Sequence, residues 1–339
     1  MTNFYLDFEK PLVELQNKID ELQTLSSNNQ LDVAGEIKSL TERLDEMREK
    51  IHSSLTPWQR VQLARHPQRP HALDYIEALF DDFIELSGDR RFQDDKAIVG
   101  GFAKFHNTPV MAIGTQKGRD MKENVMRNFG WPNPEGYRKA LRLMKLADKA
   151  KVPIITFIDT PGAFPGVASE ERHIAEAIAV NLRDMFALTV PVICIIIGEG
   201  GSGGALGIGI GNRLLVMENA YYSVITPEGC AAILWKDRAF APQAAEALGL
   251  TAAKLLELKV ADEIINEPVG GAHSAPEGAF EEVGKAIKKH LAQLKRMTGE
   301  ELKAQRYEKF RAMGRFIEAP PEPSAADQTP EATGSDCPK

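Results

Sequence analysis

Val190-Pro-Val-Ile-Cys-Ile-Ile-Ile-Gly-Glu-Gly-Gly-Ser-Gly-Gly-Ala-Leu-Gly207 is the stretch that decides the fold of this chain. Its apolar half, residues 190–197, predicts a buried strand, and its glycine-rich half predicts a tight loop and a short helix from Ser202. Glycine lets a ligand approach bare backbone N–H groups, and the first N–H groups of a helix lie unpartnered at the positive end of its dipole. The stretch therefore predicts a receptor for negative charge.

A second predicted strand, residues 153–159, also ends in a glycine-containing segment, Asp159-Thr-Pro-Gly-Ala-Phe-Pro-Gly166. Strands alternate with helices here, which indicates an α/β fold with a largely parallel, buried sheet. Ligands bind beyond the carboxyl ends of such strands, so we expect the two segments to meet at one site. Predicted strands span 97–105, 109–116, 153–159, 190–197, 213–217 and 221–224. Predicted helices span 73–86, 135–149, 170–188, 202–211, 228–236, 240–248, 251–258, 277–297 and 300–312.

The N-terminal region has helical apolar spacing in two segments, 12–25 and 36–54, separated by the polar residues 26–30. This pattern predicts a helical hairpin over residues 1–56, whose apolar stripe packs on the protein surface or contacts another subunit. Residues 57–318 form the α/β domain in this interpretation. Residues 319–339 are rich in proline, alanine and acidic residues, so we predict a disordered tail without a catalytic role.

Composition excludes several classes of function for these 339 residues. The net charge of −7 argues against a nucleic-acid binder. No apolar run approaches the roughly 20 residues of a membrane helix, and the acidic beginning lacks the pattern of a secretory leader. The three cysteines are widely spaced, which disfavours a disulfide framework or a zinc site in this chain. A cytoplasmic protein is the simplest expectation.

The glycine-rich stretch admits several interpretations. Gly198, Gly200 and Gly203 match the spacing of a dinucleotide fingerprint, although the stretch is too glycine-dense and lacks the rest of that unit. No P-loop spacing occurs anywhere in the chain. The glycines could instead only permit close packing of a helix on a strand.

A nucleophile elbow is a further alternative, with Ser202 as nucleophile and Asp262 and His273 as its partners. The interpretation that fits best is an oxyanion hole, in which the backbone N–H groups of Gly203 and Gly204 hold an oxygen that becomes negative during reaction.

A local basic cluster stands out in this acidic protein: Lys117, Arg119, Lys122 and Arg127. Such a cluster is either a solvated face or a site for the phosphates of a large anionic substrate. The sequence alone leaves both open.

Several long motifs together resemble one known family. They include His66-Pro-Gln-Arg-Pro70, Leu86-Ser-Gly-Asp-Arg90, Asn128-Phe-Gly130, Ile154-Ile-Thr-Phe-Ile-Asp-Thr-Pro-Gly162, Ile197-Gly-Glu-Gly-Gly-Ser-Gly-Gly-Ala-Leu206 and Tyr222-Ser-Val-Ile-Thr-Pro-Glu-Gly-Cys230. The chain resembles, from Phe4 to about residue 315, the carboxyltransferase alpha subunit of bacterial acetyl-coenzyme A carboxylase. Trp131 and Gly207 depart from the expected methionine and alanine.

The resemblance implies a crotonase-like spiral of β-β-α units, in the ClpP/crotonase class, and a carboxyl transfer. Carboxybiotin on a biotin carrier protein would give its carboxyl group to acetyl-CoA and form malonyl-CoA, the first committed step of fatty acid biosynthesis. Gly203 and Gly204 match the motif that holds the ureido oxygen of biotin. The expected biotin pocket comprises Gly162, Ala163, Phe164, Gly166, Gly200, Gly201 and Ser202.

The resemblance also implies partners. A beta subunit would complete the active site in an alpha-2 beta-2 assembly, carry the zinc and bind the acetyl-CoA thioester, while a separate biotin carboxylase uses ATP. We expect this chain itself to bind no metal and no resident cofactor. Two rival functions remain open, a stand-alone acyl-CoA hydratase or isomerase and a non-catalytic scaffold subunit.

Overall fold

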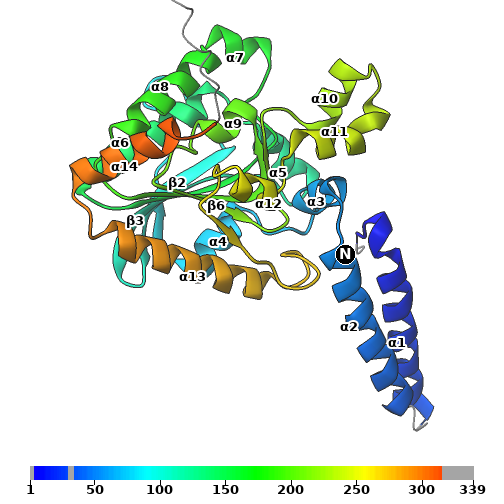
Figure 1. The fold of residues 1–339 in the computed structure, drawn as a ribbon. Coiled ribbons are helices and arrows are strands. Elements are labelled where there is room, and N and C mark those ends of the chain that lie inside the picture. Colours follow the sequence, from blue (N-terminus) through cyan, green and yellow to red (C-terminus); the bar gives the residue numbers. More distant parts are fainter. Residues whose placement is uncertain (1–3, 30–33, 315–339) are drawn as a thin grey trace, which may run out of the picture.

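The computed structural model describes residues 4–29 and 34–314. A helical hairpin projects from a body in which helices cover a sheet (Figure 1). The predicted tail, residues 319–339, lies outside the described residues, as do residues 315–318 of the predicted domain.

The described part of the chain contains one eight-stranded sheet, with strand order β1-β2-β3-β4-β5-β6-β8 and β7 paired to β5. The strands are β1 (Asp81–Glu85), β2 (Ile98–Phe105), β3 (Thr108–Thr115), β4 (Ile154–Thr160), β5 (Val192–Gly201), β6 (Arg213–Met217), β7 (Tyr221–Ser223) and β8 (Glu263–Ile265). The pairs β1–β2 and β2–β3 are antiparallel, and all other pairs are parallel. The α/β class and the largely parallel sheet are thus confirmed.

Helices lie on both sides of this sheet, with α6 and α8 packed together on one side and α4 and α13 on the other (Figure 1). The helices of the body are α3 (Pro57–Ala64), α4 (Ala72–Leu79), α5 (Met121–Met126), α6 (Pro134–Ala150), α7 (Val167–Glu171), α8 (Ile174–Phe186), α9 (Ser202–Leu206), α10 (Pro227–Leu234), α11 (Ala241–Leu248), α12 (Ala252–Glu257), α13 (Pro276–Leu294) and α14 (Gly299–Arg311). Short 3-10 turns are η1 (Asp7–Glu9), η2 (Asn128–Gly130) and η3 (Arg238–Phe240).

Three predicted elements are wrong in extent. The helix expected over 170–188 is divided into α7 and α8, because His173 adopts a left-handed φ of 64° that ends regular helix geometry. The helix expected over 73–86 ends at Leu79, and β1 occupies Asp81–Glu85. The helix expected over 202–211 ends at Leu206. β8 was not predicted, because its three residues are too few for a periodic signal.

The hairpin consists of α1 (Lys10–Asn29) and α2 (Ala34–Ser53). Residues 26–29, predicted as a separating loop, belong to α1. Leu12, Leu15 and Ile19 of α1 and Leu44 of α2 are buried together, so the apolar stripes of the two helices cover each other. The hairpin therefore buries its apolar faces without lying flat on the body (Figure 1).

The core lies at β4 and β5, whose residues are all buried. These two central strands lead directly into the two predicted glycine-containing segments. Across residues 4–29 and 34–314, no helix combines the length and apolar character needed to cross a bilayer.

Candidate active site

The junction between β5 and α9 contains no loop. β5 continues through all the glycines to Gly201, and α9 begins at Ser202. The chain changes direction at Ser202 alone, which adopts a φ of 50° that non-glycine residues rarely take. The predicted tight loop is therefore wrong, because the glycines 198–201 pair in the sheet, with Gly200 opposite Thr160 of β4 and Tyr222 of β7.

Close packing, rather than backbone conformation, explains why most of these positions are glycine, since none of them has a positive φ. A Cβ atom on Gly198 would lie 2.5 Å from Oδ1 of Asp159, and one on Gly201 would lie 2.1 Å from the Pro161 carbonyl oxygen. A Cβ on Gly200 would lie 2.8 Å from a backbone oxygen, that of Tyr221. The packing interpretation of the stretch thus holds for these positions.

Gly203 and Gly204 differ from each other in their surroundings. A Cβ on Gly204 would lie 2.4 Å from the carbonyl carbon of Gly162, whereas the nearest atom to a Cβ on Gly203 is Cδ1 of Ile178, at 3.5 Å. Gly204 is buried and its carbonyl accepts a hydrogen bond of 3.2 Å from Oη of Tyr137, while Gly203 is half-buried. Only Gly203 therefore has room beside its Cα.

The two glycine-containing segments meet, as predicted from their positions after neighbouring strands. Gly201 and Gly204 pack directly on the backbone of residues 161–163. Within that segment, Gly162 faces the Trp131 ring, and Phe164 lies against Gly166. These contacts fix residues 161–166 against the start of α9.

A cavity of about 350 Å³ opens beside the start of α9. Its lining is mainly apolar and comprises Ser202, Gly203, Leu206, Tyr222, Ser223, Val224, Leu255 and Val260. We call it the apolar cavity. Of the residues predicted for the oxyanion hole and biotin pocket, Ser202 and Gly203 line it. Gly162, Gly200, Gly201 and Gly204 are buried and do not line it, and Ala163, Phe164 and Gly166 are half-buried in the neighbouring segment.

A buried network of charges lies beneath the glycine junction, and sequence reasoning missed it. Nζ of Lys117 donates to Asp159 at 2.7 Å and to Glu199 at 2.8 Å. Burial alone would raise the pKa of Asp159, but the ammonium of Lys117 and the nearby His71 hold it well below its usual range. Asp159 Oδ1 also accepts from the backbone N–H of Glu199 at 2.9 Å. The network thus joins the ends of β3, β4 and β5.

Glu199 is the only acidic side chain of the glycine-rich stretch, and a hydratase or isomerase would need such a group free. It is instead 5% exposed and accepts from Nε of Arg65 at 2.7 Å and Oη of Tyr221 at 2.6 Å, besides Lys117. Burial raises the pKa of Glu199, but the charges of Lys117 and Arg65 outweigh it and lower the pKa overall. A buried carboxylate with these partners is a structural anion rather than a general acid.

The predicted basic cluster is largely neutralised. Besides the pairs of Lys117, Arg119 pairs with Asp74 and Arg127 pairs with Glu123. Lys122 is exposed. These pairs contradict the phosphate-site interpretation and favour an ion-paired face.

The partners considered for a Ser202 nucleophile lie elsewhere. Asp262 accepts from the backbone N–H of Leu214 at 2.6 Å and pairs with Lys309. His273 stacks on His66, with ring centroids 3.9 Å apart. The nucleophile elbow therefore lacks its base and its orienting acid.

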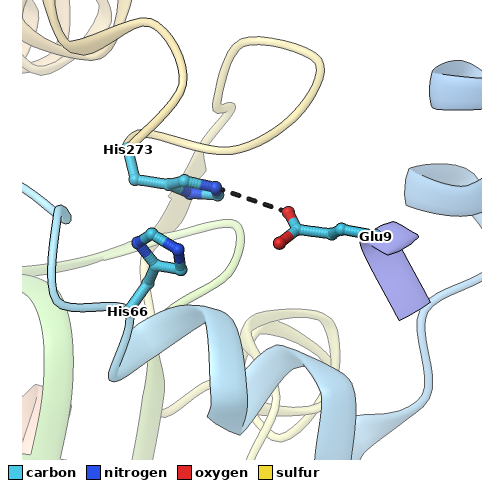
Figure 2. Close-up of side chains that lie close together, drawn as sticks. All are labelled: Glu9, His66 and His273. Carbon is cyan, nitrogen blue, oxygen red and sulfur yellow. Dashed lines mark ion pairs between the residues drawn. The ribbon is translucent and has the colours of Figure 1, made fainter. Parts of the chain in front are cut away.

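Figure 2 shows where His273 does lie, beside His66 and pointing at Glu9 of η1. His273 Nε2 is 3.4 Å from Glu9, and ligand-type atoms of all three residues lie within 4.8 Å of one another. The backbone N–H of Gln68 donates to Nδ1 of His66, so a neutral His66 carries its proton on Nε2, which faces the Phe4 carbonyl oxygen at 3.3 Å. His66 has no free lone pair for a metal, and the cluster is a contact that joins η1 to the body.

Solved structures of similar fold define the class of protein. The chain aligns with a transcarboxylase 12S structure (TM-score 0.53, 19% identity, 68% of this chain and 44% of that chain). It also aligns with a Pseudomonas malonate decarboxylase hetero-tetramer in complex with coenzyme A (TM-score 0.54, 17% identity, 66% of this chain and 88% of that chain). This chain spans less than half the length of the transcarboxylase chain. The fold is that of the crotonase-like carboxyltransferases.

The particular family follows from sequence comparisons. Residues 5–314 match the family model described as acetyl co-enzyme A carboxylase carboxyltransferase-like. The chain is 58% identical over 311 residues to the acetyl-coenzyme A carboxylase carboxyl transferase subunit alpha of Syntrophotalea carbinolica, covering 91% of this chain and 98% of that protein. The corresponding subunit of Geobacter metallireducens is 56% identical over 317 residues, covering 94% and 99%. The chain belongs to this family of carboxyltransferase alpha subunits, as its motifs predicted.

Proposed function

We propose that this chain acts as the alpha subunit of an acetyl-CoA carboxylase carboxyltransferase, which transfers a carboxyl group from carboxybiotin to acetyl-CoA and gives malonyl-CoA. Membership of the family carries the proposal. The observation in the structure that supports it is the half-buried Gly203, which begins a helix at the wall of the apolar cavity.

In this proposal the apolar cavity receives the biotin ring system, and carboxybiotin supplies the carboxyl group. The first N–H groups of α9, those of Gly203 and Gly204, hold the ureido oxygen on which negative charge develops. Ser202, Leu206 and Tyr222 surround that oxygen with a lining that is mainly apolar, which strengthens the hydrogen bonds to it. Residues 161–166 then act as a support for α9 rather than as the wall of the pocket.

The buried network keeps this arrangement rigid. Lys117 pairs with both Asp159 of β4 and Glu199 of β5. This pairing fixes the ends of the two strands, and with them the contact between residues 161 and 201, relative to each other. Preorganised donors need no rearrangement as charge develops, which is the main source of oxyanion stabilisation.

The acetyl-CoA half of the site belongs to a beta subunit in this proposal. Exposed apolar side chains occur both at the apolar cavity and on α10: Val224, which lines the cavity, is 77% exposed, and Ile233 and Leu234 of α10 are 63% and 64% exposed. Apolar surface of this kind next to a site is typical of a partner interface. The alpha-2 beta-2 assembly, the zinc on the beta subunit, the biotin carrier and the ATP-dependent biotin carboxylase complete the proposed complex.

Malonyl-CoA formation from acetyl-CoA and carboxybiotin, measured with and without the beta subunit, tests the function. We expect activity only with both subunits, and no hydration of crotonyl-CoA by this chain alone. Hydration by the single chain, or no carboxyl transfer by the assembled pair, would contradict the proposal.

Gly203→Pro tests the oxyanion role, because proline removes the N–H and the first turn of a helix tolerates it. We expect kcat to fall about 100-fold or more in the assembled enzyme. Gly203→Ala is the matched control, since it keeps the N–H and its Cβ meets nothing closer than 3.5 Å. Equal activity of the two folded, assembled variants would exclude a donor role for Gly203 and leave the chain as a scaffold.

A further inference from the structure

A second cavity, of about 320 Å³, lies between α6, α8 and the segment that precedes β2. Its lining contains five cationic side chains and two acidic ones, in a chain whose net charge is −7. The cations are Arg90, Arg91, Arg138, Arg142 and Lys145, and the acids are Asp89 and Glu176. We call it the basic cavity; it shares no lining residue with the apolar cavity.

Two of the five cations are neutralised within the fold. Nε of Arg138 donates to Asp89 at 2.8 Å, and Nζ of Lys145 lies 2.6 Å from Asp184. Because Asp89 is already paired with Arg138, the excess positive charge of the basic cavity comes from the other three cations.

The other three cations are arginines without a carboxylate partner. Arg142 donates to the backbone carbonyl oxygens of Gly88 at 3.0 Å and of Leu86 and Ser87 at 3.2 Å. Among the described residues, no carboxylate lies within ion-pair distance of Arg90, Arg91 or Arg142. Burial and the nearby charge of Arg90 lower the pKa of Arg142. Neighbouring guanidinium groups that repel one another are stabilised by an anion.

A buried acceptor also lines the basic cavity. Asn181 is fully buried, and its Nδ2 donates to the carbonyl oxygens of Tyr137 and Gly207, each at 2.9 Å. Both donor bonds fix the orientation of the amide, so the oxygen cannot exchange places with the nitrogen. Oδ1 of Asn181 is buried and has no hydrogen-bond partner among residues 4–29 and 34–314. A buried acceptor without a donor is unfavourable, so a ligand with a hydroxyl group would satisfy it.

We propose that the basic cavity binds a small phosphorylated metabolite, with its phosphate on Arg90, Arg91 and Arg142 and a hydroxyl group donating to Oδ1 of Asn181. Guanidinium forks match a phosphate in charge and in bidentate geometry. The volume suits a ligand of sugar-phosphate size. Asn181 also holds Gly207, directly after α9, so the site lies behind the glycine junction.

Isothermal titration of the full chain with ribose 5-phosphate tests the site, and the measurement needs no enzymatic activity. Inorganic phosphate and ribose serve as partial ligands. We expect ribose 5-phosphate to bind at least tenfold more tightly than inorganic phosphate and ribose not to bind. Equal affinity for ribose 5-phosphate and inorganic phosphate would overturn the proposal, because Asn181 would then contribute nothing.

The double variant Arg90→Gln, Arg91→Gln should weaken binding of ribose 5-phosphate at least tenfold. Both side chains are exposed, so the change leaves no buried charge unpaired. The double variant Lys149→Gln, Lys288→Gln removes the same number of positive charges from exposed positions outside the basic cavity and should change affinity less than twofold. Unchanged binding by the double variant refutes the site. So does a loss of binding when the chain is assembled with its beta subunit, because a partner surface would then occupy the cavity.

Discussion

Gly204→Ala is the substitution that most directly tests how the two glycine-containing segments are joined. The added methyl group would lie 2.4 Å from the carbonyl carbon of Gly162, 2.7 Å from its Cα and 2.5 Å from the backbone nitrogen of Ala163. All three are backbone atoms, so no rotamer change can relieve the contact. Overpacking of this kind costs about 1–3 kcal/mol.

Gly203→Ala provides the reference, because both positions lie in the first turn of α9 and gain similar helix propensity, up to about 1 kcal/mol. The difference in free energy of unfolding between the two variants therefore isolates the steric term. Denaturant unfolding of both full-length variants measures it. Surface substitutions ordinarily change the free energy of unfolding by no more than about 0.5 kcal/mol. If the free energies of unfolding of Gly204→Ala and Gly203→Ala differed by no more than this, the close packing of Gly204 would be refuted.

Two further predictions concern buried charge. Lys117→Met leaves the carboxylates of Asp159 and Glu199 buried without their shared cation, so it should lower the free energy of unfolding by about 3–5 kcal/mol, measured with denaturant. Lys122→Met, at an exposed position, is the control and should not destabilise the chain. Equal stability of the two variants would contradict the buried network. Burial and the neighbouring His273 lower the pKa of His66 from 6.5 to about 4, so the unfolded chain binds more protons between these values and stability should fall as the pH drops from 6.5 towards 4. Unfolding of His66→Gln, compared with the parent at pH 7 and pH 5, should show a weaker pH dependence, and an unchanged one would exclude His66 as its source.

The sequence predicted the fold well because its central strands are almost entirely apolar and are bounded by glycine or proline. The apolar runs at residues 154–158 and 192–197 clearly predict buried strands, and the apolar residues of the hairpin have clear helical spacing. The errors occur where the signal is short or local. β8 has three residues, and the break at His173 depends on one left-handed φ that helical spacing does not reveal.

The site was predicted only in part, because a glycine has two quite different uses. Gly201 was expected to line a biotin pocket and Gly204 to donate its N–H to a ligand, but both glycines are also needed for close packing on residues 161–163, as Gly198 is for packing on Asp159. Which glycine faces a neighbour and which faces a cavity depends on strand register, which one sequence does not contain. Gly203 kept its predicted position beside a cavity, and its oxyanion role stays a prediction.

The buried network had a signal that could have been noticed. Asp159 and Glu199 each come shortly after the apolar part of a strand, near the carboxyl ends of the adjacent parallel strands β4 and β5. Two acids placed so close together in a dry environment need a cation between them. Lys117, two residues after β3, was instead interpreted as part of a basic surface.

The direct passage from β5 into α9 has a consequence for how this site can evolve. Gly198, Gly200, Gly201 and Gly204 are each enclosed by other atoms, so almost any larger residue there would displace a neighbouring strand or segment. Variation in what the enzyme accepts is therefore expected at the other lining positions of the apolar cavity, such as Val224, Leu255 and Val260, where side chains can change size. The glycine backbone at the start of α9 is therefore fixed by packing, whereas the other side chains that line the apolar cavity are free to vary.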